Sequence, residues 1–473
     1  MTGNADLNIA SIEYDSRRVT SDSLFVAISG EKFDGYDFAE QAVANGAVAV
    51  LGENKECSLP EAHVSVPNAR QAMAAVAARF YGYPATKLNL FGVTGTNGKT
   101  TTCFLIRDIL EAAGHFTGLV TSSVYDTGSE IIQATRTTPE SLDLQRLLFQ
   151  INKNSCDSAV IEVSSHSLVM HRVDNVAFKT VLFTNLTRDH LDFHKSMEEY
   201  LKAKAQLLDH LADNNATAVI NIDVPEFVSL MNIDDIRFMT YSLDNSEADI
   251  YCSSYRIEPS LTKFDLMTPT GMHQVELKIP GRFNLINAVA AAAACHSAGI
   301  ADEDIVRGLE SAVPVPGRLN HIDQGQPFAL YVDFAHTPDA LERVCEAVKE
   351  LSAGRLLLLF GCGGDRDAGK RPVMGRISSE LSDITVITDD NPRTEDPAVI
   401  RREMLAGSTG SGAVHEIDGR REAIGWAVSE LQDGDVLLLA GKGHETYQII
   451  GTEKQPFDDR EIARQFLHET GKA

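Results

Sequence analysis

A glycine-rich segment with a single lysine spans residues 92–101, GVTGTNGKTT. The apolar stretch before it, residues 88–93, predicts a strand, and the apolar spacing after it predicts a helix. A glycine-rich turn between strand and helix points backbone N–H groups outward at the positive end of the helix dipole, which favours phosphate. Strict Walker spacing has glycine where Val93 stands. We therefore expect a variant nucleotide-phosphate site, with an ordinary glycine-rich turn as the alternative.

A carboxylate ends or nearly ends a second apolar run. Glu162 lies in the short β-rich stretch 159–163, which predicts a buried parallel strand. A buried carboxylate is unfavourable unless it is paired or binds a metal. We expect Glu162 to be a Mg²⁺ ligand that faces the phosphate loop, with a buried salt bridge as the alternative.

Four polar side chains that can bind cations follow the next predicted strand, residues 180–183. They are Asp189, His190, Asp192 and His194. Histidine and carboxylate groups at the carboxyl end of a strand suggest a cation site. A hydrated polar loop is the equally weighted alternative.

A lysine is expected on the inward face of the following helix. Ser196-Met197-Glu198-Glu199 has the form of a capping box, so a helix begins there. At about 100° per residue, Lys204 falls about 40° from Tyr200, on the same face as three leucines at 207, 208 and 211. Two interpretations of Lys204 are open. Either its aliphatic stem is buried while its amine reaches water, or its amine takes part in chemistry. A carbamate formed with CO₂ would make Lys204 an anionic oxygen ligand for a hard cation.

Several loops in the last third of the chain carry charged groups just after predicted strands. Asp333 and His336 follow one strand, and Arg366, Arg371 and Arg393 are predicted to lie in loops. Residues 389–393 and 441–445 are predicted to follow neighbouring strands. Arginine suits a carboxylate, and Asn and Glu suit an ammonium group, so these loops predict an amino-acid site. Surface loops with local hydrogen bonds are the alternative. Asn284, by contrast, is expected only to cap a helix.

The elements that position these groups alternate between strand and helix. Strands are expected near residues 24–28, 48–51, 159–163, 180–183, 216–220, 329–334, 356–360, 384–388 and 436–440, and a helix over 69–81. Pro84 and residues 313–317 mark two seams. This pattern predicts an α/β fold in which two doubly wound domains follow a smaller α/β domain.

Composition narrows the function. The 473 residues are too many for one core, and the net charge of −25 argues against nucleic acid as a partner. We find no apolar run of about twenty residues and no leader of the secretory type, so no membrane insertion is expected. The seven scattered cysteines favour reduced thiols and a cytoplasmic location.

Taken together, the ordered motifs resemble those of the Mur ligase family over nearly the whole chain. The resemblance covers residues 15–17, 94–100, 162–166, 189–192, 283–287, 316–318, 333–339, 363–366, 390–393 and 441–445. It implies three domains: a small UDP-binding α/β domain (1–87), a central P-loop-type ATPase with a parallel sheet (88–314), and a C-terminal Rossmann-like domain that binds the amino acid (315–473).

The resemblance also implies roles for individual residues. The catalytic residues would be Lys99, Glu162, His190, Lys204 and Arg318, with Arg318 at the γ-phosphate. ATP would be bound by Gly95, Thr96, Asn97, Gly98, Lys99, Thr100, Thr101, Asn287 (at the adenine), Asp333 and His336. Two Mg²⁺ ions would be held by Thr100, Glu162, His190 and Lys204 as a carbamate. The muramoyl substrate would contact Ser16, Thr137, Thr138, Ser164 and Arg172. The amino acid would contact Arg366, Asp390, Asn391, Pro392, Arg393, Gly441 and Glu445.

The reaction that follows from the resemblance joins UDP-MurNAc-L-Ala-D-Glu to an amino acid through an acyl phosphate, with ATP and Mg²⁺ and as a monomer. The arginine of the segment DNPR, Arg393, accompanies family members that use meso-diaminopimelate. Diaminopimelate resembles lysine with a second carboxylate, which Arg393 and Arg366 can pair with. We therefore expect meso-diaminopimelate, with L-lysine or another diamino acid as the alternative.

Two positions depart from the family pattern, and two rival functions remain. Met170 stands where some members carry a glutamine near the muramoyl sugar, and Arg136 stands, just before Thr137 and Thr138, where others have asparagine. A folylpolyglutamate synthetase shares the central and C-terminal plan, but the segments DSR at 15–17 and DNPR at 390–393 do not belong to it. A non-catalytic scaffold on the same fold is disfavoured by intact Lys99, Glu162, His190 and Lys204.

Overall fold

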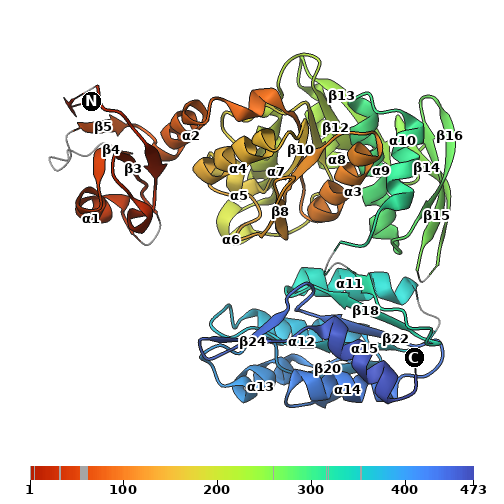
Figure 1. Ribbon diagram of the computed structural model, residues 1–473. Coiled ribbons are helices and arrows are strands. Elements are labelled where there is room, and N and C mark those ends of the chain that lie inside the picture. Colours follow the sequence, from red (N-terminus) through yellow and green to blue (C-terminus); the bar gives the residue numbers. More distant parts are fainter. Residues whose placement is uncertain are drawn as a thin grey trace. The chain divides into compact units, whose positions relative to one another are not determined.

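Figure 1 shows a computed structural model of the chain, which describes residues 2–4, 6–30, 33–53, 62–258, 260–315, 317, 319–351 and 354–472. The chain forms two compact units: Met1–Ser253 with Leu266–His273 and Asn287–Leu309, and Ser254–Asp265 with Gln274–Ile286 and Glu310–Ala473. Parallel strands alternate with helices in both, so the predicted α/β class is confirmed. The boundary expected between 87 and 88 lies inside the first unit. That boundary and the one between 314 and 315 stay predictions.

The N-terminal part is a five-stranded sheet in the order β1-β5-β4-β3-β2. Alternation along β3 sends Leu24 toward α2 and Phe25 toward α1, so each face of the sheet has its own apolar core. The strands are β1 (Thr2–Gly3), β2 (Ser11–Glu13), β3 (Ser23–Ala27), β4 (Ala47–Glu53) and β5 (Ala62–Val66). The helices are η1 (Ser16–Arg18), η2 (Gly35–Phe38), α1 (Ala39–Ala44) and α2 (Ala69–Phe80).

The central sheet places β6 between β10 and β11, and all three strands are parallel. Their carboxyl ends therefore meet at one edge of the sheet, where ligands bind in open α/β sheets. From β13 the order is β13-β12-β11-β6-β10-β7-β8-β9. The bounds are β6 (Asn89–Thr94), β7 (Thr117–Val120), β8 (Val124–Asp126), β9 (Ile131–Gln133), β10 (Ser158–Glu162), β11 (Thr180–Phe183), β12 (Thr217–Asn221) and β13 (Arg237–Ser242), followed along the chain by β14 (Ile250–Ile257), β15 (Thr262–Thr268) and β16 (Gly271–Leu277).

Helices cover both faces of this sheet. An apolar core that includes Leu148, Leu168, Tyr200 and Phe227 joins α4, α5, α7 and α8 to the strands, while α3 packs on β10 and β7. The bounds are η3 (Pro84–Lys87), α3 (Lys99–Ala112), α4 (Ser141–Lys153), α5 (Ser165–Val169), α6 (Leu191–His194), α7 (Met197–Ala205), η4 (Gln206–His210), α8 (Pro225–Val228), η5 (Ser229–Asn232), α9 (Arg282–Ser297) and α10 (Asp302–Ser311).

The C-terminal sheet has the order β17-β18-β22-β19-β20-β21 and is parallel from β18 onward. One core joins it to α11, α12 and α13, and a second core joins its other face to α14 and α15, as in a doubly wound fold. The bounds are β17 (Asn320–His321), β18 (Ala329–Asp333), β19 (Leu356–Phe360), β20 (Ile384–Ile387), β21 (Ala413–Glu416), β22 (Val436–Ala440), β23 (Tyr447–Ile450), β24 (Glu453–Pro456), α11 (Pro338–Glu350), α12 (Lys370–Leu381), α13 (Pro397–Gly407), α14 (Arg420–Glu430) and α15 (Asp459–Glu469).

The loops after β20 and β22 meet, although the two strands are not neighbours. The prediction that they are adjacent is wrong, because β19 lies between them. The loop after β19 opens with Gly361, where a Cβ atom would lie 2.6 Å from the carbonyl oxygen of Thr388 and 2.8 Å from the backbone nitrogen of Asp390. Glycine therefore lets the neighbouring loops close over the end of the middle strand.

A fully buried ion pair ties the last helix to this same edge. Arg420 donates to Asp459 across 2.6 Å, and neither side chain is exposed. Arg420 also donates to the carbonyl oxygen of Ala440 at 2.9 Å, at the end of β22. A buried guanidinium that has lost its carboxylate is strongly unfavourable. The pair therefore holds α14, α15 and β22 together below the C-terminal loops.

Asp459→Asn should lower the free energy of unfolding by about 3–5 kcal/mol, because it leaves the Arg420 charge buried without its counter-ion. Urea denaturation followed by the fluorescence of Trp426, the chain's single tryptophan and part of α14, measures this. The neighbouring change Asp458→Asn is the matched control, since asparagine also caps a helix. Equal midpoints for the two variants would refute the stabilising role of the pair.

Among the described residues, no helix combines the length and the apolarity needed to cross a lipid bilayer.

Candidate active site

The glycine-rich segment forms the turn between β6 and α3, as predicted. Gly98 has a φ of +79°, and a Cβ atom there would lie 2.3 Å from Oδ1 of Asn287, so both backbone conformation and space require glycine. Lys99 is the first residue of α3, and its amine donates to the carbonyl oxygens of Gly95 at 3.2 Å and Thr96 at 2.8 Å. The amine is thus held over the turn where a phosphate would bind.

Glu162 ends β10 beside this turn and is 2% exposed. Its Oε2 accepts hydrogen bonds from the Thr100 hydroxyl at 2.9 Å and from the backbone N–H of Ser122 at 2.9 Å. The Lys99 amine lies 4.0 Å from Oε1. The structure therefore brings together the three groups that the sequence predicted around the phosphates. The alternative of a buried salt bridge also describes part of this geometry.

Lys204 is buried at the same place. Ser196 accepts a hydrogen bond from the backbone nitrogen of Glu199, so the predicted helix start is confirmed. The α-helix ends at Ala205 and continues as the 3-10 helix η4, which the sequence did not predict. Lys204 is 1% exposed, so the alternative in which its amine reaches water is wrong.

The environment of the Lys204 amine favours its neutral form. The amine donates to the carbonyl oxygen of Gly95 at 2.7 Å and lies 4.3 Å from the ring centre of Tyr200. Burial lowers the pKa of Lys204 well below its usual value, Lys99 lowers it further, and Asp189 acts in the opposite direction. A neutral amine is nucleophilic, which is the form that reacts with CO₂.

The segment after β11 that carries His190 and His194 lies beside Tyr200 of α7. The ring centre of His190 is 6.3 Å from that of Tyr200, and the two rings of His190 and His166 are 4.7 Å apart. His194 is buried and shares a hydrogen bond of 2.9 Å with the hydroxyl of Ser165. Within the described ranges, no three His, Cys, Asp or Glu side chains converge in a metal site. The expected metal ligands, which include a threonine hydroxyl and a modified lysine, stay predictions.

Three of the five residues expected at the muramoyl substrate, Thr138, Ser164 and Arg172, gather beside Glu162. The Thr138 hydroxyl donates to the carbonyl oxygen of Glu162 at 2.8 Å and lies 3.4 Å from the Ser164 hydroxyl, and Arg172 donates to the carbonyl oxygen of Thr138 at 3.1 Å. Thr137 precedes this group in the chain. Ser16, at the start of η1, is buried and donates to Gln41 at 2.8 Å.

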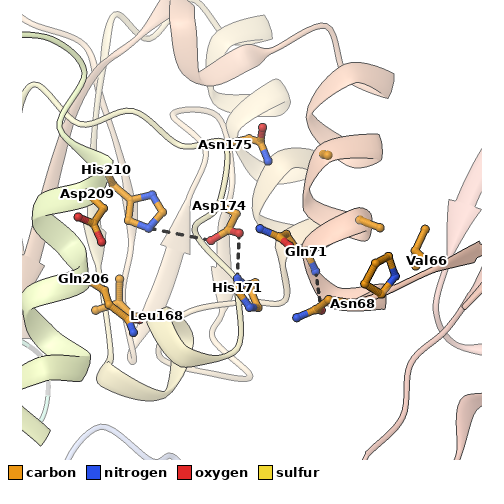
Figure 2. Close-up of a pocket in the computed structure, with 13 residues that line it drawn as sticks. Val66, Asn68, Gln71, Leu168, His171, Asp174, Asn175, Gln206, Asp209 and His210 are labelled. Carbon is orange, nitrogen blue, oxygen red and sulfur yellow. Dashed lines mark hydrogen bonds and ion pairs between the residues drawn. The ribbon is translucent and has the colours of Figure 1, made fainter. Parts of the chain in front are cut away.

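Figure 2 shows a pocket between the start of α2 and the segment that runs from α5 to η4. Its volume is about 830 Å³. His171 contacts Asp174 at 2.9 Å, and His210 lies 4.0 Å from the same carboxylate. Its lining includes Asp209 as well, and the described residues that line it include no arginine, no lysine and none of the predicted site residues. This pocket therefore does not favour an anion.

In the C-terminal unit, an amide and two charges meet where the loops after β20 and β22 cross. Asn391 donates to Glu445 at 2.9 Å and accepts hydrogen bonds from the Lys442 amine at 3.1 Å and the Ile449 backbone at 2.9 Å. A Cβ atom on Gly441 would lie 3.0 Å from Oδ2 of Asp390. The predicted grouping of Asp390, Asn391, Gly441 and Glu445 is therefore present.

Arg393 and Arg366 flank one glycine in the adjoining loop. A Cβ atom on Gly363 would lie 2.8 Å from a terminal nitrogen of Arg393 and 3.9 Å from Cγ of Arg366. Arg393 has a φ of +52° and donates to the carbonyl oxygen of Gly364 at 2.7 Å. The loop placement predicted for Arg371 is wrong, because Arg371 is buried in α12 and pairs with Glu395 and Glu403.

Four further predicted residues, Asp333, His336, Asn284 and Arg318, lie in different surroundings. Asp333 ends β18, and its carboxylate accepts hydrogen bonds from the backbones of Leu319 and Ala335, while His336 is exposed. Asn284 does not cap α9 with its side chain; its amide donates to the carbonyl oxygen of Pro280 at 2.7 Å. Arg318 lies outside the described residues.

Three family models match the chain in order: "Mur ligase family, catalytic domain" over residues 8–81, "Mur ligase middle domain" over 93–295, and "Mur ligase, glutamate ligase domain" over 317–443. The chain belongs to the Mur ligase family. Two relatives are named UDP-N-acetylmuramoyl-L-alanyl-D-glutamate--2,6-diaminopimelate ligase. The one from Geobacillus kaustophilus is 43% identical over 99% of this chain and 96% of its own. The one from Caldanaerobacter subterraneus is 42% identical over 99% and 97%.

Solved structures of other Mur ligases share the fold. A structure titled UDP-N-acetylmuramoyl-L-alanyl-D-glutamate--2,6-diaminopimelate ligase matches with a TM-score of 0.70 and 33% identity, over 98% of this chain and 95% of that one. A MurF ligase from Thermotoga maritima in complex with ADP matches with a TM-score of 0.66 and 18% identity, over 99% and 98%. The second likeness shows the fold alone.

Sequence reasoning missed three groups that contact the predicted site residues. Ser122 donates its backbone N–H to Glu162, and nothing in its sequence context predicts that contact. Lys442 has a fully buried amine beside Glu445, and its place between two glycines in a loop after a strand was an available signal. Glu140 contacts Arg172 at 2.8 Å and was not predicted to lie there.

Lys204→Met should leave the free energy of unfolding at pH 7 within about 1 kcal/mol of the wild type, or above it, because methionine fills the site without a buried amine. The unfolded chain protonates Lys204 below about pH 10, whereas the folded site disfavours that proton. Wild-type stability therefore falls as the pH is lowered from about 10 toward the folded pKa, and the variant lacks this dependence.

Urea denaturation in CO₂-free buffer from pH 7 to 10 tests this. A loss of several kcal/mol in the methionine variant would mean that the Lys204 charge stabilises the fold.

Proposed function

We propose that this chain is an ATP-dependent ligase that adds meso-2,6-diaminopimelate to UDP-N-acetylmuramoyl-L-alanyl-D-glutamate in peptidoglycan precursor synthesis. The observation that carries the proposal is the convergence of Lys99, Glu162 and Lys204 at the carboxyl ends of the central strands. The names of relatives 41–43% identical over at least 97% of the chain support the substrates. Because ATP and UDP-linked sugars are made in the cytoplasm, we place the reaction there.

In the first step, the γ-carboxylate of the D-glutamyl residue attacks the γ-phosphorus of ATP. The bond between that phosphorus and the β,γ-bridging oxygen breaks, so an acyl phosphate forms and ADP leaves. A carboxylate and a triphosphate repel each other, so the chain must supply positive charge. Lys99 and the N–H groups at the start of α3 supply it, while Thr138, Ser164 and Arg172 hold the peptide beside Glu162. Arg318 is proposed at the γ-phosphate.

The donor groups fit the Mg²⁺ ions that the family implies. The Thr100 hydroxyl and the Glu162 carboxylate are hard oxygen donors held 2.9 Å apart, and a carbamate on Lys204 adds a third such donor. We propose Thr100, Glu162, His190 and carbamylated Lys204 as ligands. The neutral Lys204 amine bonds to the carbon of CO₂ and releases one proton. When bound, the cations neutralise phosphate charge.

In the second step, the amine of the incoming amino acid attacks the acyl-phosphate carbonyl, and phosphate leaves from a tetrahedral intermediate. We propose that Asn391 and Glu445 hold the ammonium end of diaminopimelate, and that Arg393 and Arg366 pair with its distal carboxylate. L-Lysine lacks that carboxylate, so its binding leaves the arginines without their partner. The ATP contacts of Asn287, Asp333 and His336, and the uridine contact of Ser16, belong to the same proposal.

The purified protein should release ADP rapidly with UDP-MurNAc-L-Ala-D-Glu and meso-diaminopimelate, and very slowly with L-lysine. Arg393→Ala should reduce kcat/KM for diaminopimelate by about tenfold or more while changing that for lysine little. Coupled ADP-release assays with both amino acids measure this. Equal rates for the two amino acids in the wild type would overturn the choice of diaminopimelate, and release with folate instead would favour a folylpolyglutamate synthetase.

Lys204→Ala should abolish most ligase activity, and short carboxylates such as formate or acetate should restore part of it by replacing the carbamate oxygens. Lys202→Ala, on the exposed side of the same helix, is the matched control and should keep wild-type activity. The assay is again ADP release at saturating Mg²⁺. Normal turnover by Lys204→Ala would remove Lys204 from the mechanism.

A further inference from the structure

Three arginines surround one buried carboxylate near the proposed substrate peptide. Glu140 is 5% exposed, and its oxygens lie 2.8 Å from Arg172, 2.9 Å from Arg70 and 3.4 Å from Arg136. One negative charge thus faces three positive charges, which leaves a formal excess of two. Such an excess in a partly buried place favours a bound anion.

Arg172, a member of this cluster, has one unused buried donor. Its side chain is 9% exposed, and its Nε atom is buried without a hydrogen-bond partner among the described residues. Burial lowers the pKa of Arg172, Glu140 acts in the opposite direction, and Arg136 and Arg70 lower it further. An orphaned buried donor with surplus positive charge around it points to an acceptor that arrives with a ligand.

Arg136 is held at its backbone while its guanidinium stays accessible. Its backbone N–H donates to the Tyr125 hydroxyl at 3.0 Å, and that hydroxyl donates to the Arg136 carbonyl oxygen at 2.5 Å. The side chain is 54% exposed and touches Glu140 at one nitrogen. Its remaining donors can therefore reach a ligand without moving the main chain.

The position of the cluster identifies the anion. Arg172 donates to the backbone of Thr138, and the Thr138 hydroxyl donates to the backbone of Glu162. Thr138 therefore links the cluster to the main chain of Glu162, the residue whose carboxylate is proposed at the reacting phosphate. In the dipeptide substrate, the anion nearest the reacting γ-carboxylate is the α-carboxylate of the same D-glutamyl residue. The diphosphate lies beyond the sugar, toward the uridine.

We propose that Arg136, together with Arg172, binds the α-carboxylate of the D-glutamyl residue and makes the enzyme select the acid over its α-carboxamide. Glu140 is a positioning residue that holds both guanidinium groups, and Arg70 of α2 fixes Glu140 from the other side. Asparagine, which the family pattern has at this position, is uncharged and distinguishes the two substrates less. The inference rests on the proposed ligase function.

The test compares two substrates: UDP-MurNAc-L-Ala-D-Glu and the analogue with an α-carboxamide, which keeps the reacting γ-carboxylate. The measured quantity is the ratio of kcat/KM for the acid to that for the amide, with diaminopimelate and ATP saturating. Arg136→Asn should lower this ratio about five- to tenfold, through KM for the peptide substrate, because it removes one charge-assisted pair. Arg136→Lys should keep most of the ratio.

Arg79→Asn is the matched control, since it removes the same charge at the exposed far end of α2. An unchanged ratio in both Arg79→Asn and Arg136→Lys, with a reduced ratio in Arg136→Asn, supports the proposal. A wild type that uses acid and amide equally overturns it, and so does an Arg136→Asn enzyme that loses both substrates in equal proportion, which would place Arg136 at the diphosphate. A wild type that releases no ADP with either substrate refutes the ligase function itself.

Discussion

The buried carboxylate of Glu162 is the interaction on which the central site depends. It is almost without solvent, and a hydroxyl, a backbone N–H and an ammonium group hold it at the end of β10. The charged Lys99 amine lies 4.0 Å from this carboxylate, and it shares the Gly95 carbonyl oxygen with the Lys204 amine, whose burial favours the neutral form. The parallel pairing of β10 with β6 and with β7 brings these partners together, because the glycine-rich turn follows β6 and Ser122 follows β7. The sheet therefore determines the chemistry that the site can perform.

The central region and the C-terminal unit bring their polar groups together at strand ends in different ways. In the central region, one strand end brings the glycine-rich turn and Glu162 together directly. In the C-terminal unit, the groups around Asn391 come from strands with another strand between them, and glycines at the end of that strand let the loops cross. The buried pair of Arg420 and Asp459 supports that crossing from below, since Arg420 also holds the end of β22. In each sheet, the polar groups at the carboxyl ends of the strands are therefore held by strands whose faces pack into an apolar core.

Much of the fold and of the candidate site could be predicted from the sequence, and each wrong or missed prediction has a physical cause. The strand and helix pattern, the turn at Lys99 and the inward direction of Lys204 follow from local periodicity, and the structure bears them out. Strand order is a non-local property, so the intervening β19 was missed. The helical location of Arg371 was missed because a charged residue near glycines resembles a loop residue, whereas its partners Glu395 and Glu403 are distant in sequence. Glu140 was missed for the same reason: Arg70 and Arg172 lie far from it along the chain.

The backbone of Arg393 is fixed on both sides by β23 and the residue that follows it: its N–H donates to the carbonyl oxygen of Ile449, and its carbonyl oxygen accepts from the N–H of Gly451. A side chain on so rigid a support can be exchanged during evolution without rebuilding the loop that carries it. Under the proposed role of Arg393, a substitution here would alter charge or length at an unchanged anchor point and so change which diamino acid is selected.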